Sequence, residues 1–345
     1  MKFISKQQKN IVNSTDKYKL IQGCAGSNKT DTLIKCAVHD LHTNKRPILF
    51  LTLVGSVTDE IKSRMETQLG IKIEKQKISN HYLGFFEEIP ICISNYDAWV
   101  HLMLEKLKTQ DLNSFAECFS EKVDLLLHLL KTQPNPECWM KNKHKVGLLL
   151  VDEAQDLQAT KMEILTSFAN EVEVTHEMEP SINHDMDIYI AGDYLQTLYA
   201  ETNTMKAMHA MHIFKQIHPT YFDLNTCMRC PKAHVDFNNF LLHDIQIKHG
   251  IPPMLSNNHN TLDKPVLFTH LTSSNNNTNA RINAEQVTNM IRVLLEKDAT
   301  LVPGDIAIIM AKSRNNENFF QLEDTLTKLY ESLGYVGKDL SLIHI

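Results

Sequence analysis

The sequence predicts an α/β protein in which a mostly parallel sheet carries helices on both faces. Two observations support this class. Several runs are too continuously apolar to be half-exposed strands, which indicates strands buried on both faces. Amphipathic stretches of helical length separate these runs, and strands that alternate with helices are typical of doubly wound folds.

The expected elements follow one another along the first 200 residues. We expect apolar strands at 18–22, 46–54, 88–94, 145–152 and 186–193. We expect helices at 29–43, 56–69, 96–109 and 158–169. The region 101–144 contains no convincing strand and ends in the turn-like "TQPNPE", so we interpret it as a helical insertion.

A second α/β unit is expected to begin near residue 223. Its predicted elements are a helix at 231–243, a strand at 264–271, a polar loop at 272–281, a helix at 281–297, a strand at 305–312 and a helix near 318–334. We therefore predict a first domain over 1–222 and a partial second domain over 223–345. The printed sequence ends before such a second unit could close its sheet.

Composition favours a soluble intracellular protein. Of the 345 residues, 43% are hydrophobic and 22% are charged, as in ordinary globular proteins. No apolar run approaches the roughly 20 residues of a membrane helix, and "MKFISKQQKN" is too polar for a signal peptide. Seven scattered cysteines fit a reducing compartment. A net charge of −6 argues mildly against a nucleic-acid coat protein, although it permits a local DNA groove.

Residues 23–30, "GCAGSNKT", differ by one residue from the phosphate-binding pattern G-x-x-x-x-G-K-[ST]. Backbone N–H groups and a helix N-terminus would face the phosphates, Lys29 would reach the β- and γ-phosphates, and Thr30 would bind magnesium. The predicted nucleotide-binding loop comprises Gly23, Cys24, Ala25, Gly26, Ser27, Asn28, Lys29 and Thr30. Asn28 replaces a glycine, but asparagine tolerates positive φ, so we expect the loop to form.

An acidic pair supports this prediction. The segment "LLLVDEAQD" places Asp152 and Glu153 at the end of an apolar strand, where acids are costly unless they meet a cation or a water molecule. Asp152 would hold magnesium through water, and Glu153 would polarise the attacking water. The alternative is an acidic helix N-cap after a strand.

With these motifs in place, the chain resembles superfamily 1 helicases of the UvrD/Rep type over residues 3 to about 335. "ISKQQKNIV" (4–12) resembles the opening Q-motif of the family, and "DEAQD" (152–156) resembles its acidic motif. "IAGDYLQTLY" (190–199) and "LNTCMRCPKAHVDFNNFL" (224–241) resemble two later motifs. The resemblance implies two RecA-like domains of the P-loop NTPase class, the second incomplete, with ATP and Mg²⁺ bound between them.

The resemblance also implies roles for single residues. Gln8 would read adenine, Gln196 would sense the γ-phosphate, and Arg229 would be an arginine finger. Met228 stands where the family usually has an aromatic residue that stacks on adenine. After Tyr199 the chain has "AETNT" where the family tends to have an aromatic–arginine pair, and the family's last motifs are absent.

DNA contacts are implied in the same way. "FLTLVGSVTDEI" (50–61) and "ISNYDAWV" (93–100) resemble DNA-facing segments and supply Thr52, Ser94 and Tyr96, while Tyr194 is a candidate for base stacking. Trp99 is more easily explained by core packing. The implied partner is single-stranded or partly duplex DNA, with translocation from 3′ to 5′.

Three alternatives remain open at this point. "HAMH" (209–212) and "CMRC" (227–230) offer a zinc knot. The chain could instead be the motor part of a helicase–nuclease, or a nucleotide-dependent DNA-binding module that does not hydrolyse ATP. We expect the chain alone to bind ATP and to hydrolyse it slowly.

Overall fold

The computed structural model describes residues 5–76, 80–106, 119–132, 146–157, 159–167, 186–196, 218–258, 276–297, 308–310, 325, 327–329 and 342–344. The chain divides into two compact units, Met1–Pro265 and Val266–Ile345. In the described part of the chain, no helix is long and apolar enough to cross a membrane.

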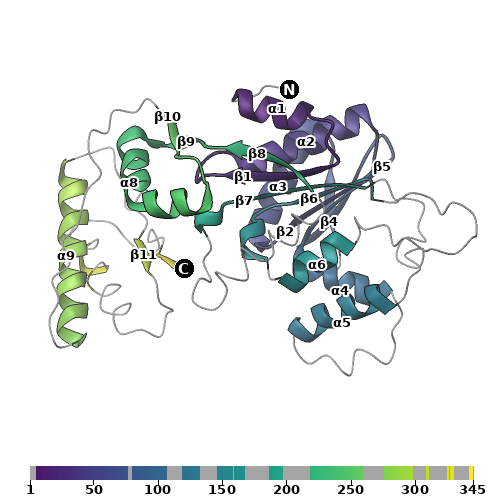
Figure 1. Ribbon diagram of the computed structural model, residues 1–345. Helices are drawn as coiled ribbons and strands as arrows, with labels where there is room; N and C mark the ends of the chain where they lie inside the picture. Colours follow the sequence, from purple (N-terminus) through teal and green to yellow (C-terminus); the bar gives the residue numbers. More distant parts are fainter. Residues whose placement is uncertain are drawn as a thin grey trace, which may run out of the picture. The chain divides into compact units, whose positions relative to one another are not determined.

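The first unit is built on an eight-stranded sheet in the order β3-β4-β5-β2-β6-β7-β1-β8 (Figure 1). Its strands are β1 (Tyr18–Gly23), β2 (Ile48–Thr52), β3 (Ile73–Lys75), β4 (His81–Phe86), β5 (Ile89–Asn95), β6 (Leu148–Val151), β7 (Asp187–Gly192) and β8 (Thr220–Leu224). The neighbouring strands β5-β2-β6-β7-β1-β8 all pair in parallel, whereas β3–β4 and β4–β5 pair antiparallel. The predicted α/β class with its parallel sheet is confirmed.

Both faces of the sheet are buried, which explains the continuous apolar runs. Successive side chains of a strand point to opposite faces. Leu149 packs into the core formed with α4 (Tyr96–Lys106), α5 (Phe119–Thr132) and α6 (Ala159–Ser167), and its neighbour Leu150 packs into the core formed with α1 (Lys6–Asn13), α2 (Lys29–Thr43) and α3 (Gly55–Leu69). The same division separates Leu20 from Ile21 and Leu49 from Phe50. A strand between two cores needs apolar side chains at every position.

The antiparallel edge of the sheet was not predicted. β4 and β5 are joined by Glu87 and Glu88, which both adopt positive φ (46° and 71°). Two-residue hairpin loops with this geometry usually contain asparagine and glycine, so a Glu-Glu pair gives no local turn signal. Gly84 allows the close approach of β3, because a Cβ atom there would lie 2.7 Å from Ile73 Cγ1.

The elements after β8 agree in part with the prediction. β9 (Thr226–Pro231) and β10 (Leu255–Asn258) form a parallel pair, and α8 (Lys232–His249) confirms the helix expected at 231–243. The second unit contains α9 (Asn276–Lys297) and the parallel pair β11 (Ile308–Met310) and β12 (Leu342–His344). The loop expected at 272–281 is wrong from residue 276 onward, because α9 begins there. The strand expected at 264–271 lies outside the described residues, and the boundary near 223 stays a prediction.

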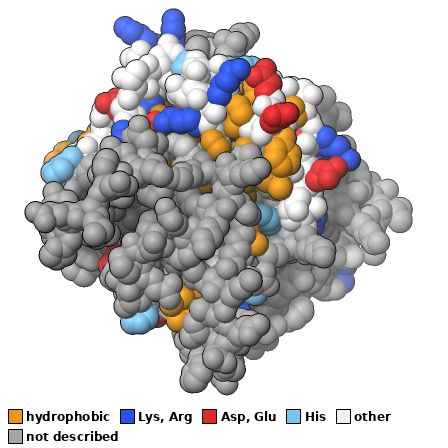
Figure 2. Space-filling view, turned by 90° about the vertical axis from the view of Figure 1, so that its right-hand side faces the viewer, with side chains coloured by type: hydrophobic (Ala, Val, Ile, Leu, Met, Phe, Trp, Pro, Cys, Tyr) orange, Lys and Arg blue, Asp and Glu red, His pale blue; other side chains and the backbone are white. Residues whose placement is uncertain are grey.

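The described surface carries charges of both signs. On the face in Figure 2, lysine, arginine, aspartate and glutamate side chains lie interspersed around a group of hydrophobic side chains. This mixture agrees with the modest net charge of −6.

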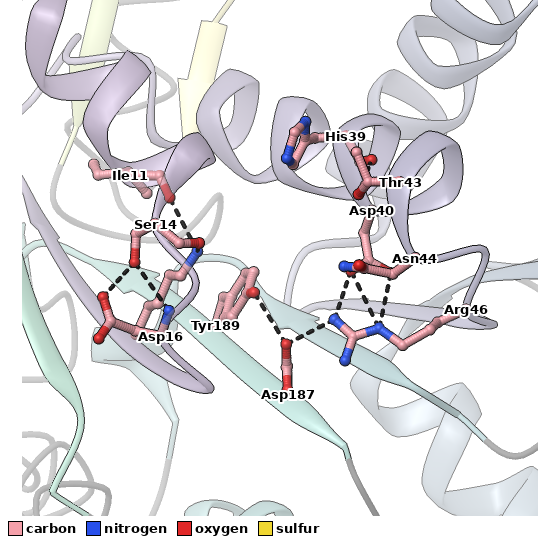
Figure 3. A network of polar contacts seen from close by, with 11 residues as sticks. Ile11, Ser14, Asp16, His39, Asp40, Thr43, Asn44, Arg46, Asp187 and Tyr189 are labelled. Atoms are coloured by element: carbon pink, nitrogen blue, oxygen red, sulfur yellow. Dashed lines mark hydrogen bonds and ion pairs between the residues drawn. The ribbon is translucent and has the colours of Figure 1, made fainter.

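A polar network joins α2 to the amino end of β7 (Figure 3). Arg46 Nη2 lies 2.5 Å from Asp40 Oδ1 and 2.6 Å from Asp187 Oδ2, and Tyr189 donates its hydroxyl to the same Asp187 oxygen at 3.2 Å. The Asp40 and Asp187 side chains are only 5% and 14% exposed. Nearby, buried Lys19 donates to the carbonyls of Ile11 and Ser14. These bonds satisfy the buried charges at the amino edge of the sheet.

We expect the Arg46→Met substitution to lower the free energy of unfolding by about 2–4 kcal/mol, because it leaves two buried carboxylates without their shared cation. Urea denaturation followed by circular dichroism measures this change. The matched control is Lys72→Met, which removes an exposed pair with Glu74 and should change stability by less than about 0.5 kcal/mol. Equal effects of the two substitutions would contradict a structural role for the Arg46 network.

Candidate active site

The candidate site lies at the carboxyl edge of the parallel strands. β6, β7 and β1 are neighbours in the sheet, so the segments that follow them emerge side by side. These segments carry Asp152, Asp193 and the loop that begins at Gly23. Ligands of open α/β sheets bind at this edge.

The loop after β1 has the backbone that its pattern predicts. Gly26 and Asn28 adopt left-handed conformations, with φ of 70° and 64°, and α2 begins at the next residue, Lys29. The Asn28 carbonyl accepts the first α2 bond, from Thr32 N at 3.0 Å. Asparagine at the non-standard position therefore supports the left-handed turn, as expected.

Lys29 is folded across the loop. Its side chain is buried, and Nζ donates to the carbonyl oxygens of Gly23 (3.2 Å) and Cys24 (3.4 Å). A Cβ atom on Gly23 would lie 2.4 Å from Lys29 Cγ, so only glycine fits there. The ammonium group is thus held inside the loop, beside the backbone N–H groups that would face a phosphate.

Thr30 and Asp152 meet directly. Thr30 donates its hydroxyl to Asp152 Oδ2 at 2.5 Å, and the Asp152 side chain is fully buried at the end of β6. Burial, with a contribution from the Glu153 charge, raises the pKa of Asp152 to about 6, although the Thr30 hydrogen bond and the Lys29 charge oppose this shift.

The second carboxylate oxygen of Asp152 differs from those of most buried acids, which are hydrogen-bonded. Oδ1 is buried and has no hydrogen-bond partner among the described residues. A buried carboxylate oxygen without a donor is costly unless a cation reaches it. Oxygen ligands from one carboxylate and one hydroxyl fit Mg²⁺, which usually keeps several of its own waters.

Glu153 belongs to a chain of amide hydrogen bonds that the sequence analysis did not single out. Gln155 Nε2 donates to Glu153 Oε2 at 2.6 Å, and Gln155 Oε1 accepts from Asp193 N at 3.0 Å. Gln22, the residue before the loop, donates to Asp193 Oδ1 at 3.3 Å. Gly192 permits this contact, since a Cβ atom there would lie 2.9 Å from Gln155 Oε1. Gln155 lies in "DEAQD" (152–156) and Asp193 in "IAGDYLQTLY" (190–199), shortly after the strands β6 and β7. Polar residues at the ends of buried strands are candidates for a site, so this position could have identified both residues.

β9 lies directly on the loop. Met228 N donates to Gly26 O at 2.9 Å, and a Cβ atom on Gly26 would lie 2.8 Å from Arg229 Cβ. A register shift in the β9–β10 pair falls in this stretch, and bulges of this kind re-aim side chains. The structure therefore brings the exposed Arg229 next to the loop, together with Lys29, Thr30, Asp152 and Glu153.

Comparison with known families gives a match over the segment that contains the loop. Residues 4–94, from α1 into β5, match the UvrD/REP helicase N-terminal domain. Residues 4–94 are thus similar to the N-terminal domain of UvrD-type helicases. This match confirms the resemblance on the segment that contains the loop and the first proposed DNA-facing stretch after it.

Other comparisons gave more distant similarities. The large terminase of a thermophilic bacteriophage has a TM-score of 0.38 and 9% identity, over 64% of this chain and 45% of that chain. A mutant ATPase domain of the Thermus phage P74-26 large terminase has a TM-score of 0.31 and 12% identity, over 55% of this chain and 65% of that chain. A further structure of that ATPase domain has a TM-score of 0.29 and 12% identity, over 55% and 64%. The chain thus spans about half to two thirds of these proteins. No match was found among curated proteins.

Three of the four predicted DNA-facing side chains are not at the surface. Thr52, Ser94 and Tyr96 are 1%, 0% and 1% exposed. The Tyr96 hydroxyl donates to Lys161 O at 3.0 Å, and its ring packs edge-on against Trp99, which is a core residue as expected. A ring enclosed in this way cannot stack on a base in the described conformation. Tyr194, in the 3₁₀ turn η4 (Tyr194–Gln196) after β7, is half-buried against the same core.

The remaining predicted residues have defined positions. Gln196 ends η4, where its backbone N–H bonds to Asp193 O at 3.0 Å. Gln8 is buried beneath α2. Cys227 and Cys230 pack with Cys24 in a small apolar cluster under the loop. In the described part of the chain, no group of three or more His, Cys, Asp or Glu side chains is placed to hold a metal ion, and residues 209–212 lie outside that part.

The buried Asp152 predicts a pH dependence of stability. Its pKa rises from 3.8 to about 6 on folding, so its contribution to stability is present at low pH and is lost as the pH rises through 6. In metal-free buffer, the Asp152→Asn variant should gain about 2 kcal/mol over the parent protein between pH 4.5 and 7.5. Urea denaturation at several pH values tests this, with Glu74→Gln as an exposed control. Parallel pH profiles of parent and Asp152→Asn would contradict the perturbed acid.

The left-handed backbone at position 28 gives another test. Asn28→Gly should change the free energy of unfolding by less than about 0.5 kcal/mol, whereas Asn28→Val should lower it by about 1–2 kcal/mol because a β-branched residue is strained at positive φ. Asn10→Val, on the helical backbone of α1, controls for the side-chain change. Urea denaturation compares the three variants, and a stable Asn28→Val protein would show that the loop has another conformation.

Proposed function

We propose that this chain is the ATP-hydrolysing motor part of a UvrD-type helicase that acts on single-stranded DNA. The observation that carries the proposal is the convergence of Lys29, Thr30 and Asp152 at one point of the sheet edge, directly beside the left-handed loop. These residues come from two segments more than a hundred positions apart in the sequence. Their convergence, with one carboxylate oxygen left without a described donor, suits a magnesium–nucleotide complex.

Each residue of the site has a role in this proposal. Loop N–H groups and the Lys29 ammonium bind the phosphates, and Thr30 with Asp152 holds Mg²⁺. When bound, Mg²⁺ supplies positive charge to the phosphate oxygens. Glu153 orients a water molecule and accepts its proton as the water oxygen forms a bond to the γ-phosphorus. The bond from that phosphorus to the β-phosphate bridging oxygen breaks, which yields ADP and inorganic phosphate.

Arg229 supplies positive charge to the transferring phosphoryl group in this proposal. Its strand is bonded to Gly26 through Met228 N, and Arg229 Cβ lies next to the loop, so we propose that the guanidinium group reaches the phosphates. An arginine at such a position neutralises charge on the transferring phosphoryl group, and similar arginines contribute about 10³–10⁵ to the rate in phosphoryl-transfer enzymes. Gln155 and Asp193 connect Glu153 to η4, and thus to Gln196, the proposed γ-phosphate sensor.

DNA binding is proposed on narrower grounds than the sequence suggested. Tyr194 remains the candidate for base stacking. The side chains near the ends of β2 and β5 are buried, namely Thr52, Ser94 and Tyr96. Any DNA contact in this region would therefore come from neighbouring exposed groups. On the face in Figure 2, the described side chains carry charges of both signs and form no continuous basic patch. The 3′–5′ direction is proposed from the UvrD-type resemblance.

ATP binding and hydrolysis by two variants test the proposal. Lys29→Ala should weaken ATP binding at least about tenfold, because it removes the loop cation. Glu153→Gln should keep ATP binding but lower the hydrolysis rate by about 10²-fold or more, because it removes the proton acceptor. Calorimetric titration and phosphate release, each with and without single-stranded DNA, give the two readouts.

The exposed residues Lys72 and Glu74 supply matched controls, since Lys72→Ala and Glu74→Gln make the same changes away from the site. ATP binding without turnover, with or without DNA, would favour a non-hydrolysing binding module. ATP binding that is insensitive to Lys29→Ala would contradict the proposed site altogether.

A further inference from the structure

The side-chain amide of Gln8 is fully engaged inside the protein. Its Nε2 donates to Asp31 Oδ2 at 2.9 Å and to Thr32 Oγ1 at 3.2 Å, and its Oε1 accepts from Lys35 Nζ at 2.8 Å. A glutamine amide has two N–H donors, and both are used here. The orientation is unambiguous, because the reverse would place the amide oxygen against a carboxylate and the amide N–H groups against an ammonium. The residue is only 2% exposed.

These partners form one buried ionic network at the start of α2. Asp31 Oδ2 lies 2.5 Å from Lys35 Nζ, and Asp31 Oδ1 lies 2.5 Å from Arg64 Nη2 on α3. Burial alone would raise the pKa of Asp31, but hydrogen bonds from Lys35 and Gln8 and the charges of Lys35 and Arg64 keep it below its ordinary value. Gln8 therefore helps to hold a buried charged pair in place, immediately after Lys29 and Thr30.

Releasing the amide to face a nucleobase would break this network. Lys35 and Asp31 would each lose a hydrogen bond in a buried setting, and buried charged groups that lose partners are strongly destabilising. Discrimination of adenine from guanine requires free donors and acceptors aimed at the base edge. Gln8 has no N–H donor to spare for that task.

The neighbouring polar side chains are also paired with one another. Gln7 Nε2 donates to Asn225 Oδ1 at 2.8 Å, and Thr226 Oγ1 donates to Gln7 Oε1 at 3.3 Å. Met228 offers a thioether, whose sulfur accepts from Asn257 Nδ2 at 3.4 Å. Thioether contact with a base is apolar and adaptable, so it supplies affinity without a preference for one base.

We propose that the site binds nucleoside triphosphates as a class, through the phosphates, and does not select adenine. Gln8 is a positioning residue: it fixes Asp31 and Lys35, and through them the first turn of α2, from which Lys29 and Thr30 reach the phosphates. This inference rests on the proposed nucleotide-binding function, and it replaces the base-reading role that the resemblance implied for Gln8.

The test compares four nucleotides on two proteins. Dissociation constants of the magnesium complexes of ATP, GTP, CTP and UTP are measured by calorimetry at about 10 °C for the parent chain and for Gln8→Met, which keeps the side-chain length but removes its hydrogen bonds. For the parent chain we expect ATP and GTP constants within about threefold, whereas paired hydrogen bonds to a base edge would separate them by about tenfold or more. Gln8→Met should weaken all four nucleotides by a common factor of about 3–10, because the network that holds the start of α2 is lost.

Each result is decisive for the inference. A preference of about tenfold or more for ATP in the parent chain overturns it, whether or not Gln8→Met abolishes that preference. Unchanged affinities in a folded Gln8→Met protein overturn the positioning role. Should Gln8→Met not fold, the ratio measured on the parent chain still decides base selection, and Lys9→Met, an exposed change on the same helix, controls for substitution in α1. Failure of every nucleotide to bind would instead refute the proposed function itself.

Discussion

The hydrogen bond between Thr30 and Asp152 is the constraint on which the candidate site depends. It joins the first turn of α2 to the end of β6, and it fixes the phosphate loop relative to the acidic motif. The bond exists because a fully buried carboxylate needs a donor, and Thr30 supplies one for Oδ2 alone. Burial, together with the charge of Glu153, raises the pKa of Asp152 despite this donor and the nearby Lys29 charge. A buried acid with a raised pKa at the edge of a sheet is typical of sites that bind a ligand.

The two edges of the sheet treat buried charge differently. At the amino edge, Arg46 neutralises two carboxylates and Lys19 donates to backbone carbonyls, so the charges there are satisfied within the protein. At the carboxyl edge, Lys29 bonds only to loop carbonyls, and Asp152 keeps an oxygen without a described partner. The charges at the amino edge are therefore paired within the protein, whereas the carboxyl edge keeps a buried oxygen that a ligand of the proposed site would satisfy. The amides of Gln22 and Gln155 link the groups of the second edge without neutralising them.

Local patterns in the sequence were enough to predict the parallel strands, the loop and the positive φ of Asn28, because each depends on a few consecutive residues. The hairpin at Glu87–Glu88 could not be predicted, since its left-handed turn is imposed by pairing of β4 with β5 and not by the turn residues. The buried positions of Thr52 and Ser94 follow from tertiary packing at the strand ends, which no local pattern shows. The same holds for Gln8, whose partners Asp31 and Lys35 lie more than twenty residues away on another helix.

The contact between β9 and the loop would determine where Arg229 lies relative to a nucleotide in the proposed function. One backbone bond, from Met228 N to Gly26 O, ties the arginine strand to the loop, and its net contribution is about 1 kcal/mol. Beneath it, Cys24, Cys227, Val235 and Met254 form an apolar contact that adds adhesion without directional bonds. In the proposed function, this junction would keep Arg229 near the phosphates of a bound nucleotide, because β9 contacts both the loop and, through Thr226, Gln7 on α1.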